Sequence, residues 1–380
     1  MKYVYKKRVY IFLAFFLDAL GVCVFKLFRR RSRLTVSQPK KILVVRLDHL
    51  GDVLQATGVP KTLKENYSGC QVIFLTSSWA SPLLENNPFI DEIILFDAPW
   101  FSKKRYRRSG KAHGFFKLLK ILRQRKIDLA LGLRGDLREN LMMFLAGVKE
   151  RIGYGITGGG FFLTREVAYR HEAHESEHQK DLLRVLGLKG EVLEPKIYFS
   201  EAEELGFKNR LEQFGLGGGQ KYICFLLEAG APSKDWPMAN ADAFLKLFAK
   251  NFPNQKVVLV GSVGRGPGQS GAGNEGCVVD LIGKTSLREL FILVKKSSFF
   301  IGPDSGPTHV AAVLGVPALF LYSGSNRYEQ WKPLAESAVV LRHSVPCSPC
   351  GSEICHVEGH PCMTHISAEE AIKIMINKVS

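Results

Sequence analysis

From about residue 40 onward, short apolar runs alternate with amphipathic stretches along the chain. Short apolar runs bounded by turn-forming residues are typical of strands buried in a parallel sheet, and the amphipathic stretches between them are typical of helices. This alternation predicts an α/β protein built from βαβ units. The strands expected from the pattern are residues 41–47, 71–75, 222–227, 256–260, 297–302 and 317–321.

Two of these strands run directly into an expected helix. The first leads through Gly51, which permits a tight turn, to Asp52 at a helix start. The second leads through residues 304–309, which are small, hydroxyl-bearing or polar, into a helix over residues 310–315. A helix start directs free N–H groups and a positive dipole end at one spot, which favours an anion such as a diphosphate. Ordinary helix capping explains the same residues.

Asp52 therefore has two interpretations. An Asp at a helix N-terminus is usually a cap. A carboxylate held there can also serve as a general base toward an incoming hydroxyl group. Sequence spacing does not choose between these two roles.

The length of the chain, 380 residues, exceeds what one hydrophobic core normally fills, so two domains are expected. With 46% hydrophobic residues the chain is globular. A hinge is predicted around residues 195–204, followed by a helix over residues 201–214. The predicted division is a membrane-associating segment 1–38, an N-terminal Rossmann-like domain 39–198 and a C-terminal Rossmann-like domain 199–380.

The N-terminal segment contains an apolar stretch, residues 9–28, that is about long enough to span a bilayer. However, Asp18 lies in its middle, and an Asp at the bilayer centre costs about 2.5–3.5 kcal/mol. Basic residues flank both ends, and the small-residue cleavage pattern of a secretory signal is absent from the sequence. The prediction is a helix that lies in the membrane interface with its basic flanks on anionic headgroups, and a single span is the alternative.

Three blocks of this sequence resemble glycosyltransferase family 9, the heptosyltransferases. They are RLDHLGDVL at residues 46–54, EAGAPSKDWP at residues 228–237 and GPDSGPTH at residues 302–309. The family also has characteristic stretches between these blocks, and this sequence resembles them at residues 128–135, 151–154 and 280–287. The resemblance therefore covers roughly residues 40–375. It implies a GT-B architecture, in which two Rossmann-like halves face each other across a cleft.

The resemblance also implies a metal-independent, inverting transfer of a sugar, most often a heptose, from a nucleotide diphosphate. Asp52 would be the general base on the acceptor hydroxyl, and Lys234 would neutralise the departing diphosphate. A lysine and a set of amides placed where charge develops lower the barrier without a metal. The candidate donor-diphosphate residues are Ser233, Asp304, Ser305, Gly306, Pro307, Thr308 and His309. The candidate acceptor-binding residues are Gly51, Arg105, Arg107, Arg108 and Arg134.

The net charge of +16 is concentrated in the flanks of the N-terminal segment and in the basic loop at residues 103–108. A charge run is usually a solvated face, and nucleic acid is the general alternative. No RRM, KH or helix-turn-helix signature is present, so we expect no nucleic-acid partner. The basic loop is predicted to contact the acceptor or a lipid headgroup.

The predicted partners are therefore a nucleotide-diphosphate sugar, with ADP-heptose favoured, lipopolysaccharide core or a similar glycolipid, and the membrane surface. No cofactor is expected, and the predicted location is the cytoplasmic face of the inner membrane. Two alternatives stay open. One is a family 9 transferase with another donor and a polysaccharide acceptor, and the other is a catalytically silent GT-B protein that binds glycolipid or nucleotide.

Three further motifs need interpretation. Cys347, Cys350, Cys355 and Cys362 have a spacing compatible with a structural zinc site, which the sequence alone does not decide. The string HESEH at residues 174–178 matches a zinc-protease motif, but its surroundings are polar and no third ligand is evident. The glycine-rich stretch 261–276 departs from the family, whose members usually have a helix there, and leaves the site for the nucleotide base and sugar undefined.

Overall fold

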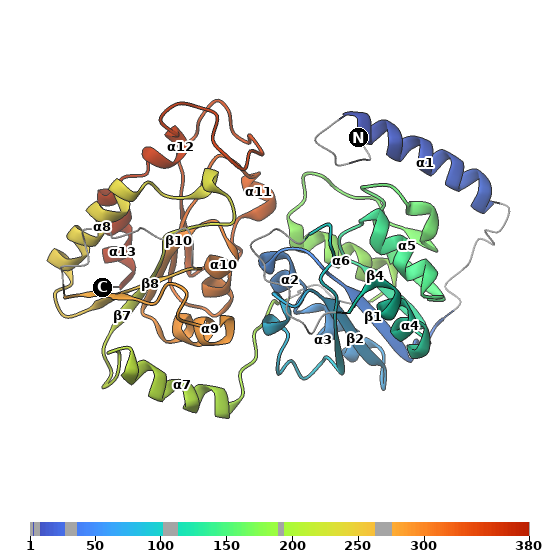
Figure 1. Cartoon of the computed structure of the whole chain (residues 1–380), viewed down its shortest axis with the longest axis horizontal. Helices are drawn as coiled ribbons and strands as arrows, with labels where there is room; N and C mark the ends of the chain where they lie inside the picture. Colours follow the sequence, from blue (N-terminus) through green and yellow to red (C-terminus); the bar gives the residue numbers. More distant parts are fainter. Residues whose placement is uncertain are drawn as a thin grey trace. The chain divides into compact units, whose positions relative to one another are not determined.

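The computed structural model describes residues 3, 8–26, 36–101, 113–188, 194–262 and 276–379. The chain divides into two compact units, Met1–Tyr198 and Phe199–Ser380, and Figure 1 shows each as a sheet covered by helices. Each unit contains a six-stranded sheet in which every pairing is parallel. The α/β class with parallel sheets is therefore confirmed, and each unit is described by itself below.

The first unit consists of α1 (Arg8–Lys26), β1 (Lys41–Val45), α2 (Leu50–Ala56), α3 (Val59–Asn66), β2 (Gln71–Thr76), the 3-10 turn η1 (Ser81–Leu83), β3 (Glu92–Leu95), α4 (Phe115–Arg125), β4 (Leu129–Gly132), α5 (Leu137–Leu145), β5 (Glu150–Gly153), η2 (Gly160–Phe162), β6 (Arg165–Glu166) and α6 (Glu175–Val185). Its strands are ordered β3-β2-β1-β4-β5-β6.

The strand order of the first sheet determines where a ligand would bind. The central strand β1 pairs with β2 on one side and β4 on the other, so the chain reverses its direction of travel across the sheet at β1. In open parallel sheets a crevice forms at this switch point, outside the carboxyl ends of the strands. Residues 46–52 leave β1 at that end. The first sequence block that resembles family 9 therefore lies where the fold favours a ligand.

The second unit consists of α7 (Glu201–Gln213), β7 (Tyr222–Leu226), η3 (Pro232–Lys234), α8 (Met238–Asn251), β8 (Lys256–Val260), β9 (Val278–Asp280), α9 (Leu287–Lys296), β10 (Phe299–Pro303), α10 (Gly306–Val313), β11 (Ala318–Leu321), α11 (Tyr328–Trp331), β12 (Ala338–Leu341), α12 (Pro361–Thr364) and α13 (Ala368–Val379). Its strands are ordered β12-β11-β10-β7-β8-β9.

The second sheet has the same switch-point topology. Its central strand β7 pairs with β8 on one side and β10 on the other. The loop after β7 carries the second block of family resemblance, and the loop after β10 carries the third. Apolar side chains pack on both faces of this sheet, so β7, β10 and β11 are buried along their whole length. Both blocks therefore meet at the carboxyl edge of one rigid sheet.

All six strands expected from the apolar runs exist within one or two residues of the predicted bounds, as does the helix predicted for residues 201–214. That helix, α7, begins with a capping box in which Ser200 and Glu203 exchange hydrogen bonds between side chain and backbone. Arg288 on α9 then holds the Glu203 carboxylate, with its Nε 2.8 Å from Oε1. This ion pair therefore fixes the start of α7, at the beginning of the second unit, to α9.

The predicted N-terminal helix exists as α1, and it lies against η2 of the first unit. One stripe of the helix, formed by Ala14, Asp18 and Gly21, is buried. Oδ1 of Asp18 accepts a 2.7 Å hydrogen bond from the backbone N–H of Gly159. At Gly21 a Cβ would approach the ring of Phe161 to 2.4 Å, so the present close contact depends on the absence of a side chain there. Asp18 therefore faces the protein rather than the apolar side of the helix.

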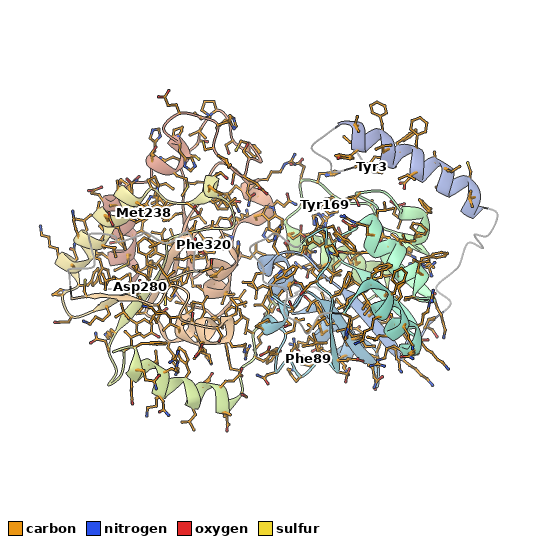
Figure 2. The ribbon with its side chains drawn as sticks, viewed as in Figure 1. Tyr3, Phe89, Tyr169, Met238, Asp280 and Phe320 are labelled. Atoms are coloured by element: carbon orange, nitrogen blue, oxygen red, sulfur yellow. The ribbon has the colours of Figure 1, made fainter. Side chains whose placement is uncertain are left out.

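The opposite side of α1 is covered with exposed apolar side chains (Figure 2). Nine large ones are between 48% and 67% exposed: Val9, Tyr10, Phe12, Leu13, Phe15, Phe16, Leu17, Leu20 and Val24. Among the described residues, no helix is long and apolar enough to cross a membrane.

Candidate active site

Arg46 is the centre of the cluster at the carboxyl end of β1, and its side chain is only 2% exposed. Nε donates to Oδ1 of Asp48 at 2.7 Å, and Nη1 donates to the carbonyl oxygen of Leu133 at 3.0 Å. Nη2 donates both to Oδ1 of Asp52 at 2.8 Å and to Oε1 of Glu175 at 2.9 Å. Burial opposes its charge, but the three carboxylates outweigh burial and raise the pKa of Arg46 further. One guanidinium thus contacts three buried carboxyl groups.

Asp52 is the third residue of α2, which begins at Leu50 after the N-cap residue His49, and its carboxylate takes part in the capping box of this helix. Its Oδ2 accepts a 3.2 Å hydrogen bond from the backbone N–H of His49. Each carboxylate oxygen has two lone pairs, so Asp52 retains acceptor capacity beyond these two contacts. Gly51, one residue earlier, has open space where a Cβ would stand. The geometry is compatible with a base that a hydroxyl group approaches.

Asp48 and Arg134 form the edge of this cluster. Burial raises the pKa of Asp48, and the nearby Asp52 carboxylate adds to this effect against the opposing pull of Arg46. Nη1 of Arg134 lies 3.7 Å from Oδ2 of Asp48, and its guanidinium stacks 3.7 Å from the ring centroid of Phe101. Among the predicted acceptor-binding residues, the structure therefore brings Gly51 and Arg134 to the Asp52 cluster.

The third carboxylate of the cluster, Glu175, begins α6. Its Oε2 lies 3.2 Å from Nδ1 of His178, and Nε2 of His178 lies 3.0 Å from the carbonyl oxygen of Arg170. Burial opposes ionisation of Glu175, but Arg46 and His178 outweigh it and hold its pKa below the usual value. The HESEH string is therefore part of the support of Asp52, and its histidines do not converge on one point as zinc ligands would.

A second cluster lies at the carboxyl edge of the other sheet, around Asp304. Its Oδ2 is 2.7 Å from Nζ of Lys234 and accepts a 2.8 Å hydrogen bond from Nδ2 of Asn326. Its Oδ1 lies 3.1 Å from Nε2 of His309. Burial opposes ionisation of Asp304, but the charge of Lys234 and the contact with His309 outweigh it, and the pKa lies well below the usual range. Asp304 is therefore an ionised anchor for a lysine and a histidine.

Lys234 is the last residue of η3, and its side chain is 17% exposed. Nζ also donates to the backbone carbonyl of Asp304 at 3.2 Å. Trp236, two residues later, is buried against Phe225 and Phe244, and its Nε1 donates to the carbonyl oxygen of Ile366. This packing places Lys234 at the strand edge with its side chain partly accessible. A fixed, partly accessible ammonium group can stabilise a leaving phosphate.

The remaining residues of the predicted diphosphate loop form the start of α10. Ser305 is the N-cap residue, and Pro307 occupies the first turn after Gly306. The hydroxyl of Thr308 donates to the carbonyl oxygen of Pro303 at 2.6 Å, and Oγ of Ser305 lies 3.2 Å from Oγ1 of Thr308. These bonds join the loop to β10. A helix N-terminus held in this way is a suitable place for a phosphate.

Ser233 lies beside Lys234, but its polar groups contact the chain near the C-terminus. Its Oγ donates to the carbonyl oxygen of Ser352 at 2.6 Å, and its N–H donates to that of Glu353 at 3.0 Å. Nε2 of His360 lies 3.0 Å from the carbonyl oxygen of Ser233. The contacts of Ser233 therefore fasten η3 to residues 352–360, and its role toward a diphosphate stays a prediction.

Some predicted residues lie outside the described part of the chain. They are Arg105, Arg107 and Arg108 of the basic loop and most of the glycine-rich stretch 261–276. Five residues of the two clusters were not expected from the sequence: Arg46, Asp48, Glu175, His178 and Asn326. Arg46 and Glu175 are far apart in the chain, so only the fold reveals their contact. A charged Arg at the end of an apolar strand was the one available signal.

The four C-terminal cysteines are free thiols. Burial raises the pKa of the Cys362 thiol, and the nearby thiols of Cys355, Cys347 and Cys350 add to this. Within the described ranges, no group of three or more Cys, His, Asp or Glu residues is arranged to hold a metal ion.

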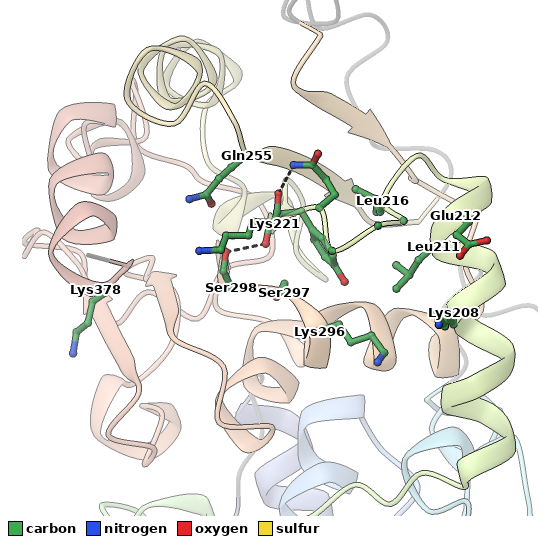
Figure 3. A pocket seen from close by; sticks show the side chains of 15 residues that line it. Lys208, Leu211, Glu212, Leu216, Lys221, Gln255, Lys296, Ser297, Ser298 and Lys378 are labelled. Atoms are coloured by element: carbon green, nitrogen blue, oxygen red, sulfur yellow. Dashed lines mark hydrogen bonds between the residues drawn. The ribbon is translucent and has the colours of Figure 1, made fainter.

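A cavity of about 510 Å³ lies in the second unit, at the amino ends of β7 and β10 (Figure 3). Exposed lysines and a glycine loop line it, including Lys208, Lys221 and residues 217–219. The Asp304 cluster lies at the opposite, carboxyl edge of the same sheet. The hydroxyl of Ser298 in the wall donates to the backbone of Tyr222. The cavity is therefore separate from the candidate diphosphate site.

Known proteins resemble this chain over most of its length. The sequence profile of a family described as "Glycosyltransferase family 9 (heptosyltransferase)" matches residues 115–360. Lipopolysaccharide heptosyltransferase 3 from Escherichia coli is 27% identical over 304 residues, which cover 76% of this chain and 85% of that protein.

Solved structures show the same fold. The Escherichia coli ADP-heptose lipopolysaccharide heptosyltransferase II has a TM-score of 0.70 at 23% identity, and the match covers 89% of this chain and 98% of that one. A glycosyl transferase of family 9 from Veillonella parvula has a TM-score of 0.74 at 21% identity, covering 90% and 97%.

Proposed function

Because the chain belongs to glycosyltransferase family 9, we propose that it transfers a heptose from ADP-heptose onto lipopolysaccharide core or a related surface glycolipid. One observation carries the proposal: a buried, arginine-held carboxylate and a lysine–aspartate pair occupy the switch points of the two sheets. ADP-heptose is favoured as donor because the matching relatives include heptosyltransferases. In the GT-B arrangement that the resemblance implies, both clusters would act on one donor and one acceptor.

The proposed reaction is a single displacement. Asp52 accepts the proton of an acceptor hydroxyl while the hydroxyl oxygen attacks the anomeric carbon of the donor sugar. The bond from that carbon to the diphosphate breaks, and the nucleoside diphosphate leaves with the electron pair. Attack opposite to the leaving group inverts the anomeric configuration. Arg46 neutralises the Asp52 carboxylate before proton transfer, and the acceptor stands over open Gly51.

The departing diphosphate gains negative charge in this step. Lys234 and the amides at the start of α10 supply positive charge there, so the proposed stabilisation needs no metal. The pair with Asp304 keeps the lysine ammonium at a defined place. Ser233, Ser305, Thr308 and His309 are proposed to complete the diphosphate site, and Arg134 to contact the acceptor.

The experiment that tests this function is mass spectrometry of membrane glycolipids from cells with the gene, without it, and with Asp52→Ala in its place. We expect a glycolipid that lacks one heptose mass in both the deletion and the substituted strain. A different missing sugar would keep the transferase and replace the donor. Unchanged glycolipids in both strains would overturn the transfer proposal and favour a silent binding protein.

We also propose that the protein works at the cytoplasmic face of the inner membrane and that α1 attaches it there. The nine exposed apolar side chains of α1 form one face, while Asp18 and Gly21 hold the other face on the protein. The segments on both sides of the helix are rich in lysine and arginine. An apolar helix face with basic flanks suits the interface of an anionic bilayer, which is the occupant we assign to it.

A further inference from the structure

The HESEH string has a place in the fold that differs from its zinc-protease reading. His174 is the N-cap residue of α6, and its Nδ1 accepts a hydrogen bond from the N–H of Ser176. Glu175 turns inward to Arg46, and His178, one turn later, is completely buried beside Glu175. Glu177 lies half-buried on the helix and pairs with Lys180. Two of the five residues therefore join the network around Asp52.

We propose that Glu175 and His178 are positioning residues, which hold Arg46 and, through it, Asp52 in the orientation that general-base catalysis requires. The proposal rests on the proposed role of Asp52 as the base. It adds that α6, which lies more than a hundred residues further along the chain, contributes to the reaction by orienting Asp52 through Arg46.

The geometry at Nη2 of Arg46 carries this inference. A guanidinium Nη2 has two N–H bonds in a fixed plane. One points to Asp52 and the other to Glu175, at 2.8 and 2.9 Å. The other two contacts of Arg46, to Asp48 and the Leu133 carbonyl, keep its plane from rotating. A change at Glu175 therefore acts on the same nitrogen that orients the proposed base.

His178 completes the support. Its two ring nitrogens face a carboxylate oxygen and a backbone carbonyl oxygen, which both accept hydrogen bonds. The ring of Tyr169 stacks on His178 with centroids 3.9 Å apart and fixes the plane of the imidazole. The result is a buried series of contacts that runs from His178 through Glu175 and Arg46 to Asp52.

This arrangement gives Glu175 a function distinct from packing. With its carboxylate present, Arg46 divides its charge between two acids. Without that negative charge, Arg46 interacts more strongly with Asp52 and makes it a weaker base. A weaker base slows the proton-transfer step but leaves the binding of donor and acceptor unchanged. The signature of a positioning role is therefore a change in kcat at constant KM.

The test is steady-state kinetics of the full-length chain with ADP-heptose and heptose-deficient lipopolysaccharide. Glu175→Gln is the main variant, because the amide removes the negative charge but keeps the shape of the side chain, and its oxygen can still accept from Arg46. We expect kcat to fall on the order of tenfold, which is less than the loss expected for removing the base itself. Both KM values should stay within about twofold of those of the unsubstituted chain.

A double-variant experiment tests whether Glu175 acts through Asp52 or only through the stability of the fold. In an Asp52→Asn background, Glu175→Gln should cause no further loss of kcat, because the residue through which it acts is already gone. Glu177→Gln is the matched control on the same helix and should leave kcat unchanged. His178→Ala should lower kcat, and His178→Asn, whose amide can donate to Glu175 in place of Nδ1, should recover part of it.

Two results would overturn the inference. One is an unchanged kcat for Glu175→Gln, and the other is the same loss with and without Asp52. Both leave the transferase proposal intact, provided that the unsubstituted chain transfers sugar. Absence of transfer by the unsubstituted chain would instead remove the proposed function, and the role of Glu175 with it.

Discussion

Nη2 of Arg46 lies 2.8 Å from Oδ1 of Asp52, and both side chains are almost completely buried. A carboxylate in such a place stays ionised only when a cation compensates for its lost hydration. The same arginine also holds Asp48 and Glu175, so the charge of the candidate base depends on a group shared among three acids. Arg46 therefore affects both the proposed reaction at Asp52 and the stability of the first unit.

Asp52→Asn should abolish most of the sugar transfer. The amide preserves the shape of the side chain and can still accept from Arg46, but it cannot take a proton. We expect kcat to fall about 10²–10⁴-fold, the usual contribution of a general base, with KM nearly unchanged. Initial rates with ADP-heptose measure this, and Glu92→Gln, a carboxylate paired with Arg125, is the control that should retain full activity.

Arg46→Met should strongly destabilise the first unit. It removes the cation that three buried carboxylates share, and loss of one member of a buried ion pair costs about 3–5 kcal/mol. Denaturant unfolding monitored by circular dichroism gives the free energy of unfolding. Arg125→Met removes a partly exposed pair with Glu92 and should cost less than about 1 kcal/mol. Equal losses for the two variants would contradict the central role of Arg46.

Lys234→Met should impair transfer through the leaving group. The variant removes the ammonium that lies against Asp304, and loss of one such stabilising donor lowers kcat about 10²–10³-fold. Calorimetric binding of ADP should weaken in parallel. Lys208→Met, in the wall of the cavity in Figure 3, should change neither quantity. An effect of Lys208→Met on ADP binding would move the nucleotide to that cavity.

Stability at acid pH should depend on the pair of Glu203 and Arg288. The hydrogen bonds and charge of Arg288 lower the pKa of Glu203 from 4.5 to about 2. A carboxylate whose pKa is depressed by folding stabilises the folded state above its unfolded pKa, and this stabilisation is lost as the pH falls toward the folded value. The difference in unfolding free energy between the unsubstituted chain and Glu203→Gln should therefore shrink between about pH 5 and pH 3. A constant difference would contradict this.

Membrane binding should depend on the apolar face of α1. A double substitution, Phe12→Glu with Phe16→Glu, places charges on that face and should abolish co-flotation with vesicles of phosphatidylethanolamine and phosphatidylglycerol. Leu205→Glu alters an equally exposed apolar residue on α7 and should leave flotation unchanged. Retained flotation of the double variant would show that another surface binds the bilayer. A shift from dimer to monomer without vesicles would assign the face to a second copy.

The periodicity of the chain predicted the strands well, because buried parallel strands are continuous apolar runs with turn residues at their ends. It also placed Asp52 near a helix start, as observed, but the helix predicted for residues 310–315 begins earlier, at Gly306, within the predicted loop. The partners of Asp52 were not predictable in this way. Glu175 and Arg46 are 129 positions apart, and their contact depends on how α6 packs beside α2. The local pattern around Glu175, the HESEH string, matches a zinc-protease motif and gives no indication of a contact with Arg46.

The N-terminal segment shows the same limit. Its apolar length predicted a helix, and Asp18 was an obstacle to placing that helix in a bilayer. The backbone N–H of Gly159, which receives Asp18, is 141 positions away and belongs to a turn without apolar periodicity. Long-range hydrogen bonds of this kind are specified by tertiary packing, which single-sequence patterns do not contain.

The apolar face of α1 has a practical consequence for handling the protein. In a buffer without lipid or detergent, nine large apolar side chains on one helix will associate with any other apolar surface, including the same face of a second molecule. Oligomers measured under those conditions would then report helix-to-helix adhesion rather than a physiological assembly. Sizing experiments with and without a mild detergent, or on the chain shortened to begin at residue 36, separate the two.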